Sequence, residues 1–206
     1  MLMDLTAIDR LPETLKNKIS LQNIAAGETL FAQGDRTSAF YVVTSGIVKL
    51  IRYLDDGKIC TFEIVRTNQA LAEIALFAEI YPCTAIAEID SKVISYPKDE
   101  LLETLQLDPA MSRDFMEMLV EKIESLKFRL ELRDIRVADK RVIYYLRHLV
   151  DYPTENTVVL DRPLKDIASD LGFTPETLSR ALIKLETDGL ISRSDRVIVL
   201  QNSSLT

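Results

Sequence analysis

Segment 164–186 constrains the fold of this chain of 206 residues more than any other part of it. Ile167 and Leu171 form the apolar face of a short helix, and Ala168 is small where a second helix must cross closely. Gly172 follows, and glycine can take the positive φ that lets a chain leave a helix sharply. The segment therefore predicts two short helices joined by a tight turn.

The second helix of this pair is expected to begin after Thr174, an N-cap residue, with Pro175 in its first turn. Four apolar residues recur at helical spacing and are expected to face inward: Leu178, Ala181, Leu182 and Leu185. Glu176, Ser179 and Arg180 share the opposite face. Arginine can pair with guanine and glutamate can accept from cytosine, so a helix-turn-helix with a base-contacting second helix is predicted. Taken alone, these three residues also fit an ordinary solvated helix face.

A β-hairpin wing is expected after Gly189, with strands over 190–192 and 197–200. Its turn would bring two arginines near the DNA phosphates, where they would position the protein on the duplex. The full set of predicted DNA contacts is Thr174, Glu176, Thr177, Ser179, Arg180, Lys184, Arg193 and Arg196.

The middle of the chain predicts one long helix that begins at Pro109, after an Asp108 cap. Five apolar residues along it step by three and four, the spacing of a coiled-coil seam: Met116, Leu119, Ile123, Leu126 and Leu130. Such a helix either packs on its own domain or forms the interface of a homodimer. The seam stops at Arg133, and a further helix capped by Asp139 is expected over 140–150. The segment between them is the expected hinge.

The first half of the chain, over 27–97, contains short candidate strands separated by turn residues. Four of the six glycines fall within the first 57 residues, as expected where tight turns are frequent. This pattern predicts a β-sandwich or β-roll. In one candidate strand, over 58–65, Cys60, Phe62 and Ile64 alternate with polar residues, so these three are expected on its buried face.

The net charge of −7 argues against a protein that binds polyanions without specificity. The charge is uneven, because residues 138–206 carry nine Lys and Arg against ten Asp and Glu, whereas residues 1–137 carry 16 against 22. The helix-turn-helix half is therefore nearly neutral. This balance predicts weak non-specific DNA binding and a strong dependence on base contacts.

Composition also limits the cellular location and the chemistry. Cys60 and Cys83 form no CxxC pair and are expected to be small buried residues of a reduced, cytoplasmic protein. No apolar run of about 18 residues is present, so no membrane-spanning segment is expected. A cupin-like β-roll enzyme would need a metal cluster with histidines, and the β-roll segment has none. A protein-interaction module without DNA binding would leave the helix-turn-helix pattern unexplained.

The order of β-roll, long helix and winged helix-turn-helix resembles the Crp/Fnr family of bacterial transcription regulators. Segments 27–35 and 39–46 are similar to its β-roll signatures, and 176–180 resembles the E-x-x-S-R recognition helix of the Fnr-like branch. The resemblance implies an α+β fold and a non-enzymatic homodimer that binds inverted repeats of TTGA-type half-sites and contacts RNA polymerase. The implied domains are a β-roll effector domain over 1–108, a dimerisation helix over 109–137 and a winged helix-turn-helix over 138–206.

The effector pocket implied by this resemblance consists of Ala72, Glu73, Ile74, Cys83, Thr84 and Leu126. The cyclic nucleotide-binding members have Gly-Glu and then Arg-Ser at the matching places, where the arginine pairs with the phosphate. Here Cys83 stands in place of that arginine. A buried phosphate without its cation is unfavourable, so we expect no cyclic AMP binding. The segment 68–78, which contains Glu73, is expected to form a short helix among the strands.

Residues 1–59 contain no cysteine, which excludes the iron–sulfur cluster of the Fnr type. Segments 72–77 and 174–180 most resemble the denitrification-regulator branch, whose members are similar to nitric oxide sensors that use haem. Haem ligands here would come from His148, the two cysteines, Met or Tyr, although His148 equally fits a partly exposed helix residue. Haem, a redox role for Cys83 and a small apolar or anionic effector stay open.

Overall fold

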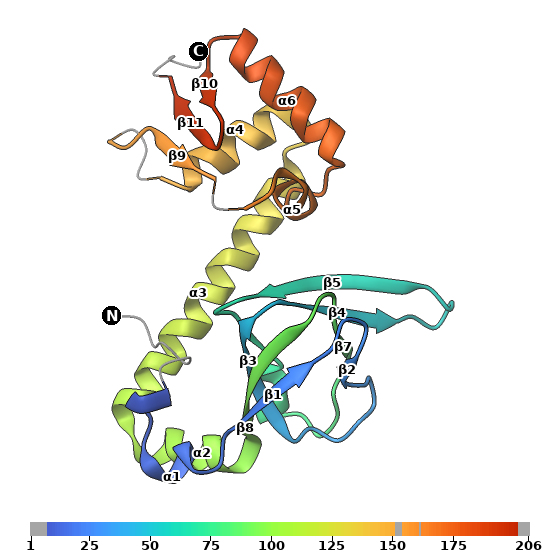
Figure 1. The fold of residues 1–206 in the computed structure, drawn as a ribbon, viewed down its shortest axis with the longest axis vertical. Helices are drawn as coiled ribbons and strands as arrows, with labels where there is room; N and C mark the ends of the chain where they lie inside the picture. The colour runs from blue at the N-terminus through green and yellow to red at the C-terminus, as the bar shows by residue number, and fades with distance from the viewer. Residues whose placement is uncertain (1–7, 151–153, 161, 202–206) are drawn as a thin grey trace. The chain divides into compact units, whose positions relative to one another are not determined.

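The structure is a computed structural model that describes residues 8–150, 154–160 and 162–201. The chain divides into two compact units, residues 1–119 and 120–206, and the boundary falls within the long helix α3 (Pro109–Asp134). Figure 1 shows the order of helices and strands along the chain. Among the described residues, none of the helices is both long enough and apolar enough to cross a membrane.

The first unit contains two four-stranded antiparallel sheets among its described residues, in the orders β1-β8-β3-β6 and β2-β7-β4-β5. The core lies between them, because buried side chains from both sheets belong to one cluster, such as Val43 and Val93 from one sheet and Val48 and Ala85 from the other. This β-roll confirms the predicted class. The strands are β1 (Ser20–Ile24), β2 (Thr29–Phe31), β3 (Ala39–Ser45), β4 (Ile47–Tyr53), β5 (Ile59–Arg66), β6 (Ala70–Leu71), β7 (Thr84–Ala87) and β8 (Ser91–Pro97).

The prediction for the strand at 58–65 was wrong about its buried face. Cys60 is exposed and Phe62 is 46% exposed, whereas Val65 is the buried residue of β5. Leu50 of β4 pairs with Glu63 and Ile51 with Thr61, so β5 contains a bulge with one extra residue, and such a bulge changes which side chains face the core. Of the two cysteines, only Cys83 is buried as expected.

The segment 68–78 contains the short helix that was expected, but only over four of its residues. It forms β6, which pairs with β3, and then a single 3₁₀ turn, η2 (Glu73–Leu76). Ala72 joins the two with a positive φ of 65°, which breaks the regular pattern between them. Ala75 and Leu76 of this turn are buried.

Helices precede and follow the β-roll strands in the first unit: η1 (Ile8–Arg10), α1 (Glu13–Lys16), α2 (Lys98–Leu107) and the first part of α3. The Asp108 carboxylate accepts hydrogen bonds from the backbone N–H groups of Ala110 and Met111, both at 3.0 Å, which confirms the predicted cap of α3. Met111 and Phe115 then pack with Phe40 of β3 in a second core cluster. The first two turns of α3 are therefore part of the β-roll unit.

The second unit is a winged helix-turn-helix around one core cluster. Its elements are the end of α3, α4 (Ala138–His148), β9 (Thr157–Val159), α5 (Leu164–Asp170), α6 (Pro175–Thr187), β10 (Ile191–Ser194) and β11 (Val197–Leu200). The wing has a third strand that was not predicted, because β9 pairs with β11. Asp139 does not cap α4 as expected, since the N-cap residue is Val137 and Asp139 lies in the first turn.

Candidate nucleic-acid interface and effector site

The turn between α5 and α6 has the geometry that its sequence predicts. Gly172 has a φ of 69°, and the N–H of Phe173 donates to the carbonyl of Ala168 at 2.8 Å. Ala168 is fully buried at the helix crossing. The Thr174 hydroxyl accepts from the N–H of Thr177 at 3.3 Å and caps α6, with a proline in the first turn. Local sequence alone is enough to start the second helix at this point.

The outer face of α6 presents the polar residues that were expected to contact bases. Glu176 and Arg180 are exposed, and Thr177 and Ser179 are partly exposed. The four apolar residues of the opposite face are buried, as predicted: Leu178, Ala181, Leu182 and Leu185. Hydrogen bonds from its own backbone N–H and from Thr174 lower the pKa of Glu176, so its carboxylate is ionised at neutral pH. The helix thus offers a negative and a positive side chain on one accessible face.

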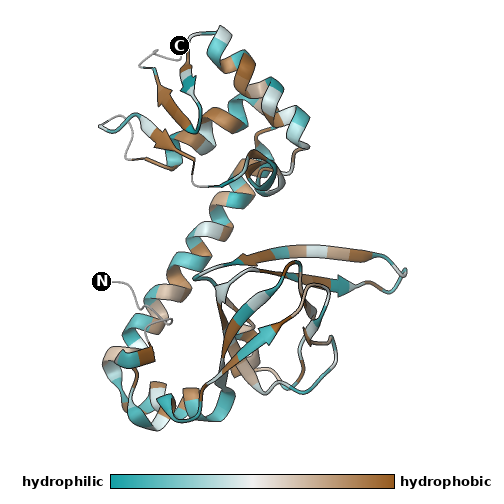
Figure 2. Cartoon of the chain, in the orientation of Figure 1, coloured by the Kyte–Doolittle hydropathy of each residue, from teal (hydrophilic) through white to brown (hydrophobic). Residues whose placement is uncertain are grey.

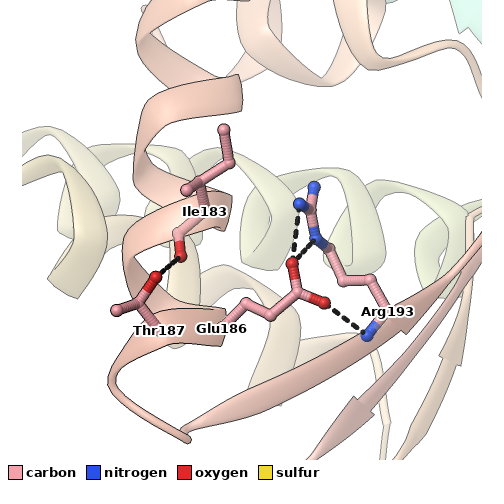
Figure 3. A network of polar contacts seen from close by, with 4 residues as sticks. All are labelled: Ile183, Glu186, Thr187 and Arg193. Carbon is pink, nitrogen blue, oxygen red and sulfur yellow. Dashed lines mark hydrogen bonds and ion pairs between the residues drawn. The ribbon is translucent and has the colours of Figure 1, made fainter.

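Arg193, one of the two wing arginines, forms an ion pair with another residue of the protein. Its guanidinium donates to a Glu186 carboxylate oxygen through Nε at 3.1 Å and Nη2 at 2.9 Å (Figure 3). Arg196 lies exposed next to Asp195, which has a positive φ of 51° in the hairpin turn. The two wing arginines are therefore in different environments, although the sequence pattern treated them alike.

Lys184, another predicted DNA contact, is also paired within the protein. Its ammonium group donates to the Asp139 carboxylate from α4 and lies 3.6 Å from a carboxylate oxygen of Asp188. The hydrogen bond from Lys184 lowers the pKa of Asp139, and the same bond raises the pKa of Lys184. The sequence pattern did not predict Glu186 and Asp139 as partners, because both pairings depend on the tertiary fold.

Of the six predicted effector residues, all but Leu126 lie in or next to β7 and η2. Cys83 and Thr84 are buried, and the Thr84 hydroxyl accepts from the N–H of Gln33 at 2.9 Å. Glu73 is partly exposed and follows Ala72 directly. Ile74 lies in η2 but is exposed, and Leu126 belongs to the second unit.

Two charged residues near Cys83, Arg52 and Glu63, were not anticipated by the sequence pattern, whereas Glu73 was. Burial raises the pKa of the Cys83 thiol, Arg52 opposes this effect, and the carboxylates Glu63 and Glu73 add to it. Arg52 donates from Nε to the Pro82 carbonyl at 3.1 Å, which places a guanidinium beside this site. A raised pKa keeps the thiol protonated at neutral pH, so Cys83 is not an activated thiolate.

The candidate haem ligand His148 stacks on Phe128 of α3, with ring centroids 3.6 Å apart and an interplanar angle of 16°. It is exposed at the end of α4, as a helix surface residue would be. Within the described part of the chain, no three His, Cys, Asp or Glu side chains are grouped so that they could hold a metal ion.

The expected seam on α3 is largely exposed within this single chain. Four of its five residues are exposed: Met116, Ile123, Leu126 and Leu130. Val120 adds to this apolar stripe, whereas Leu119 packs against the core cluster of the β-roll unit. Figure 2 shows hydrophobic and hydrophilic residues alternating along the helix. We call the exposed residues at 116, 120, 123, 126 and 130 the α3 stripe.

Comparison with known protein families agrees with both units. Residues 21–108 match the family model of the cyclic nucleotide-binding domain, and residues 140–206 match that of the Crp-like helix-turn-helix domain. The chain belongs to the Crp/Fnr family. Regulators of this family bind DNA through the second of these domains, and the matching families and relatives are transcription regulators, not enzymes.

Individual relatives in the Crp/Fnr family align along most of the chain. The nitrogen fixation regulation protein FixK of Bradyrhizobium diazoefficiens is 27% identical, with 82% of this chain and 73% of FixK covered. The transcriptional activator FnrA of Stutzerimonas stutzeri is 25% identical over 98% of this chain and 83% of its own. A crystal structure of DNR from Pseudomonas aeruginosa has a TM-score of 0.51 at 26% identity, covering 95% of this chain and 89% of that chain.

Proposed function

We propose that this DNA-binding regulator acts as a homodimer that recognises an inverted repeat, with TTGA-type half-sites contacted by α6. The exposed Glu176 and Arg180, on a helix whose opposite face is buried, carry the proposal. Arg180 would pair with guanine and Glu176 would accept from cytosine, with Ser179 beside them and Thr174 and Thr177 near the helix start. Arg196 would contact phosphate from the wing. RNA polymerase is the proposed protein partner of the bound dimer.

The α3 stripe supports the homodimer. Its five apolar residues are each about half exposed, and all but Val120 belong to the predicted coiled-coil seam. A second copy of α3 would cover this stripe, and the two copies of α6 would then face two half-sites. We accordingly divide the chain functionally into an effector domain over 1–108, a dimerisation helix over 109–137 and a DNA-binding domain over 138–206.

The proposed effector bound in the β-roll is not cyclic AMP. The buried Cys83 is uncharged at the position from which cyclic nucleotide-binding members supply a cation, and burial raises its pKa further. Isothermal titration of the purified protein with cyclic AMP should show no binding. Micromolar affinity would overturn this part of the proposal.

The DNA-binding proposal is tested by a gel shift with an inverted TTGA-type repeat and a scrambled duplex. Arg180→Ala should weaken binding to the specific duplex by about 1–3 kcal/mol per half-site and bind both duplexes alike. Arg36→Ala, which removes an exposed guanidinium from the loop before β3 in the β-roll unit, is the matched control and should discriminate like the wild-type protein. Unchanged discrimination by Arg180→Ala would refute its role.

A further inference from the structure

Arg141, in the first turns of α4, donates hydrogen bonds to backbone carbonyls from two separate segments. Its Nε donates to Ile135 at 2.8 Å and its Nη2 to Arg133 at 3.3 Å, at the C-terminal end of α3 and just after it. Its Nη1 donates to Leu171 at 2.9 Å, at the end of α5. One side chain therefore joins the end of α3 to the turn of the helix-turn-helix.

The guanidinium of Arg141 is also packed against the turn itself. Its central carbon lies 4.6 Å from the centre of the Phe173 ring, a cation–π contact. A Cβ built on Gly172 would lie 3.8 Å from Nη1, so the backbone of the turn lies close to the side chain. The contact thus involves three consecutive positions, 171–173, directly before α6 begins.

Arginine suits this place for a physical reason. The last carbonyls of a helix have no partner within the helix and carry partial negative charge. A guanidinium is planar, stays charged and offers five N–H donors in a fixed geometry, so it can serve several carbonyls and stack on a ring at once. Lysine carries the same charge but lacks that planar arrangement of donors.

We propose that Arg141 is a positioning residue that fixes the orientation of α6 relative to residues 120–130 of the α3 stripe, and thereby sets the half-site spacing that the dimer recognises. The inference rests on the proposed function, in which this stripe is the dimer seam. All the contacts of Arg141 described above lie within residues 120–206. The helix α6 starts at the Thr174 cap, directly after the turn that Arg141 contacts. The half-site spacing that a dimer recognises follows from the placement of its two recognition helices. If the turn before α6 were flexible, α6 could change its orientation and the dimer would bind repeats with several spacings.

Other contacts still stabilise the fold of the second unit when the Arg141 side chain is removed. The Asp139–Lys184 ion pair still links the first turn of α4 to α6, and the apolar core of the unit does not include Arg141. We therefore expect Arg141 variants to fold and to retain the base-contacting face of α6.

The test measures affinity for a single half-site duplex and for inverted repeats whose spacer varies by one base pair in each direction. The wild-type protein should prefer one spacing clearly. Arg141→Ala should bind about tenfold more weakly at that spacing and little differently at its neighbours, with single half-site affinity within about twofold of wild type. Arg141→Lys should behave like Arg141→Ala. Arg136→Ala, which removes an exposed guanidinium from the same linker, is the matched control and should keep the wild-type profile.

Three results would overturn the proposal. In the first, Arg141→Ala and Arg141→Lys both keep the wild-type spacing preference. In the second, both lose single half-site binding to the same extent as repeat binding, which indicates a structural role alone. In the third, the wild-type protein binds no inverted repeat, and the proposed function then fails together with this inference. Arg141→Lys keeps the test decisive if Arg141→Ala does not fold, and circular dichroism establishes folding for each variant.

Discussion

The carboxylate of Glu186 in α6 accepts three hydrogen bonds from Arg193 in β10. The donors are the Arg193 backbone N–H at 3.3 Å, Nε at 3.1 Å and Nη2 at 2.9 Å. This pairing attaches the first strand of the wing hairpin to the helix that carries the proposed base-contacting face (Figure 3). The guanidinium that the sequence pattern assigned to a DNA phosphate is thus already engaged by a carboxylate.

The two wing arginines should differ in how they affect the salt dependence of DNA binding. Arg196→Ala should reduce the slope of log K against log salt by about 2 for the dimer, because each protomer then leaves one phosphate without its cation and each lost contact lowers the slope by about 0.9. Arg193→Ala should leave the slope nearly unchanged, because its charge is neutralised by Glu186. Gel shifts or fluorescence anisotropy over a salt series measure both slopes. An equal decrease for the two variants would contradict the distinction between them.

The Asp139–Lys184 pair should make folding stability depend on acid pH. The pKa of Asp139 is lowered below its usual 3.8 in the folded protein, so the unfolded chain binds its proton more readily. The stabilisation is then complete above that value and is lost as the pH falls through the lower, folded pKa. Urea unfolding of the wild-type protein and Asp139→Asn from neutral pH to about pH 3 should show their difference shrinking only at the acid end.

Asp188→Asn is the matched control for this pH experiment. Its carboxylate lies 3.6 Å from the Lys184 ammonium and its side chain is 47% exposed, against 16% for Asp139. An exposed ion pair contributes little, so this variant should differ from the wild-type protein by less than about 1 kcal/mol at every pH. A stability difference for Asp139→Asn that did not change with pH would count against the ion pair as its cause.

A carboxylate in the middle of the α3 stripe should dissociate the proposed dimer. Ile123 is 50% exposed in the single chain, so Ile123→Glu should fold normally but place two unpaired charges at the seam. Sedimentation equilibrium should give a dimer for the wild-type protein and a monomer for Ile123→Glu. Glu124→Gln, one residue along the same helix, should remain dimeric. A monomeric wild-type protein would refute the seam.

Two glycines with almost the same backbone should respond differently to alanine. Gly46 has a φ of 95° and Gly34 one of 94°. A Cβ on Gly46 would collide with the Ser91 Oγ and lie 2.7 Å from the Asp90 carbonyl oxygen, whereas a Cβ on Gly34 meets nothing within 4 Å. Gly46→Ala should therefore destabilise the β-roll by several times as much as Gly34→Ala, which costs only the backbone strain of about 1 kcal/mol. Thermal unfolding of both variants measures the difference.

Predictions from sequence succeeded where residues close in the chain determine the structure. The caps Asp108 and Thr174 start α3 and α6 as predicted, because each cap bonds to N–H groups within three residues of itself. The prediction for Cys60 and Phe62 was wrong, because alternation in a strand shows which residues share a face but not which face is covered. A bulge in β5, where Phe62 is skipped in the pairing with β4, accompanies that error.

The two helices of the helix-turn-helix, the polar face of α6 and the order of the units follow from the sequence, since periodicity and local turn chemistry are enough to predict them. Which cations remain available to DNA depends on the packing of the folded protein. Arg193 and Lys184 are paired with carboxylates that the fold brings to them, and Arg141 bonds to a carbonyl 30 residues further along the chain. Such contacts form when helices and strands pack together, so neither residue spacing along the chain nor composition predicts them.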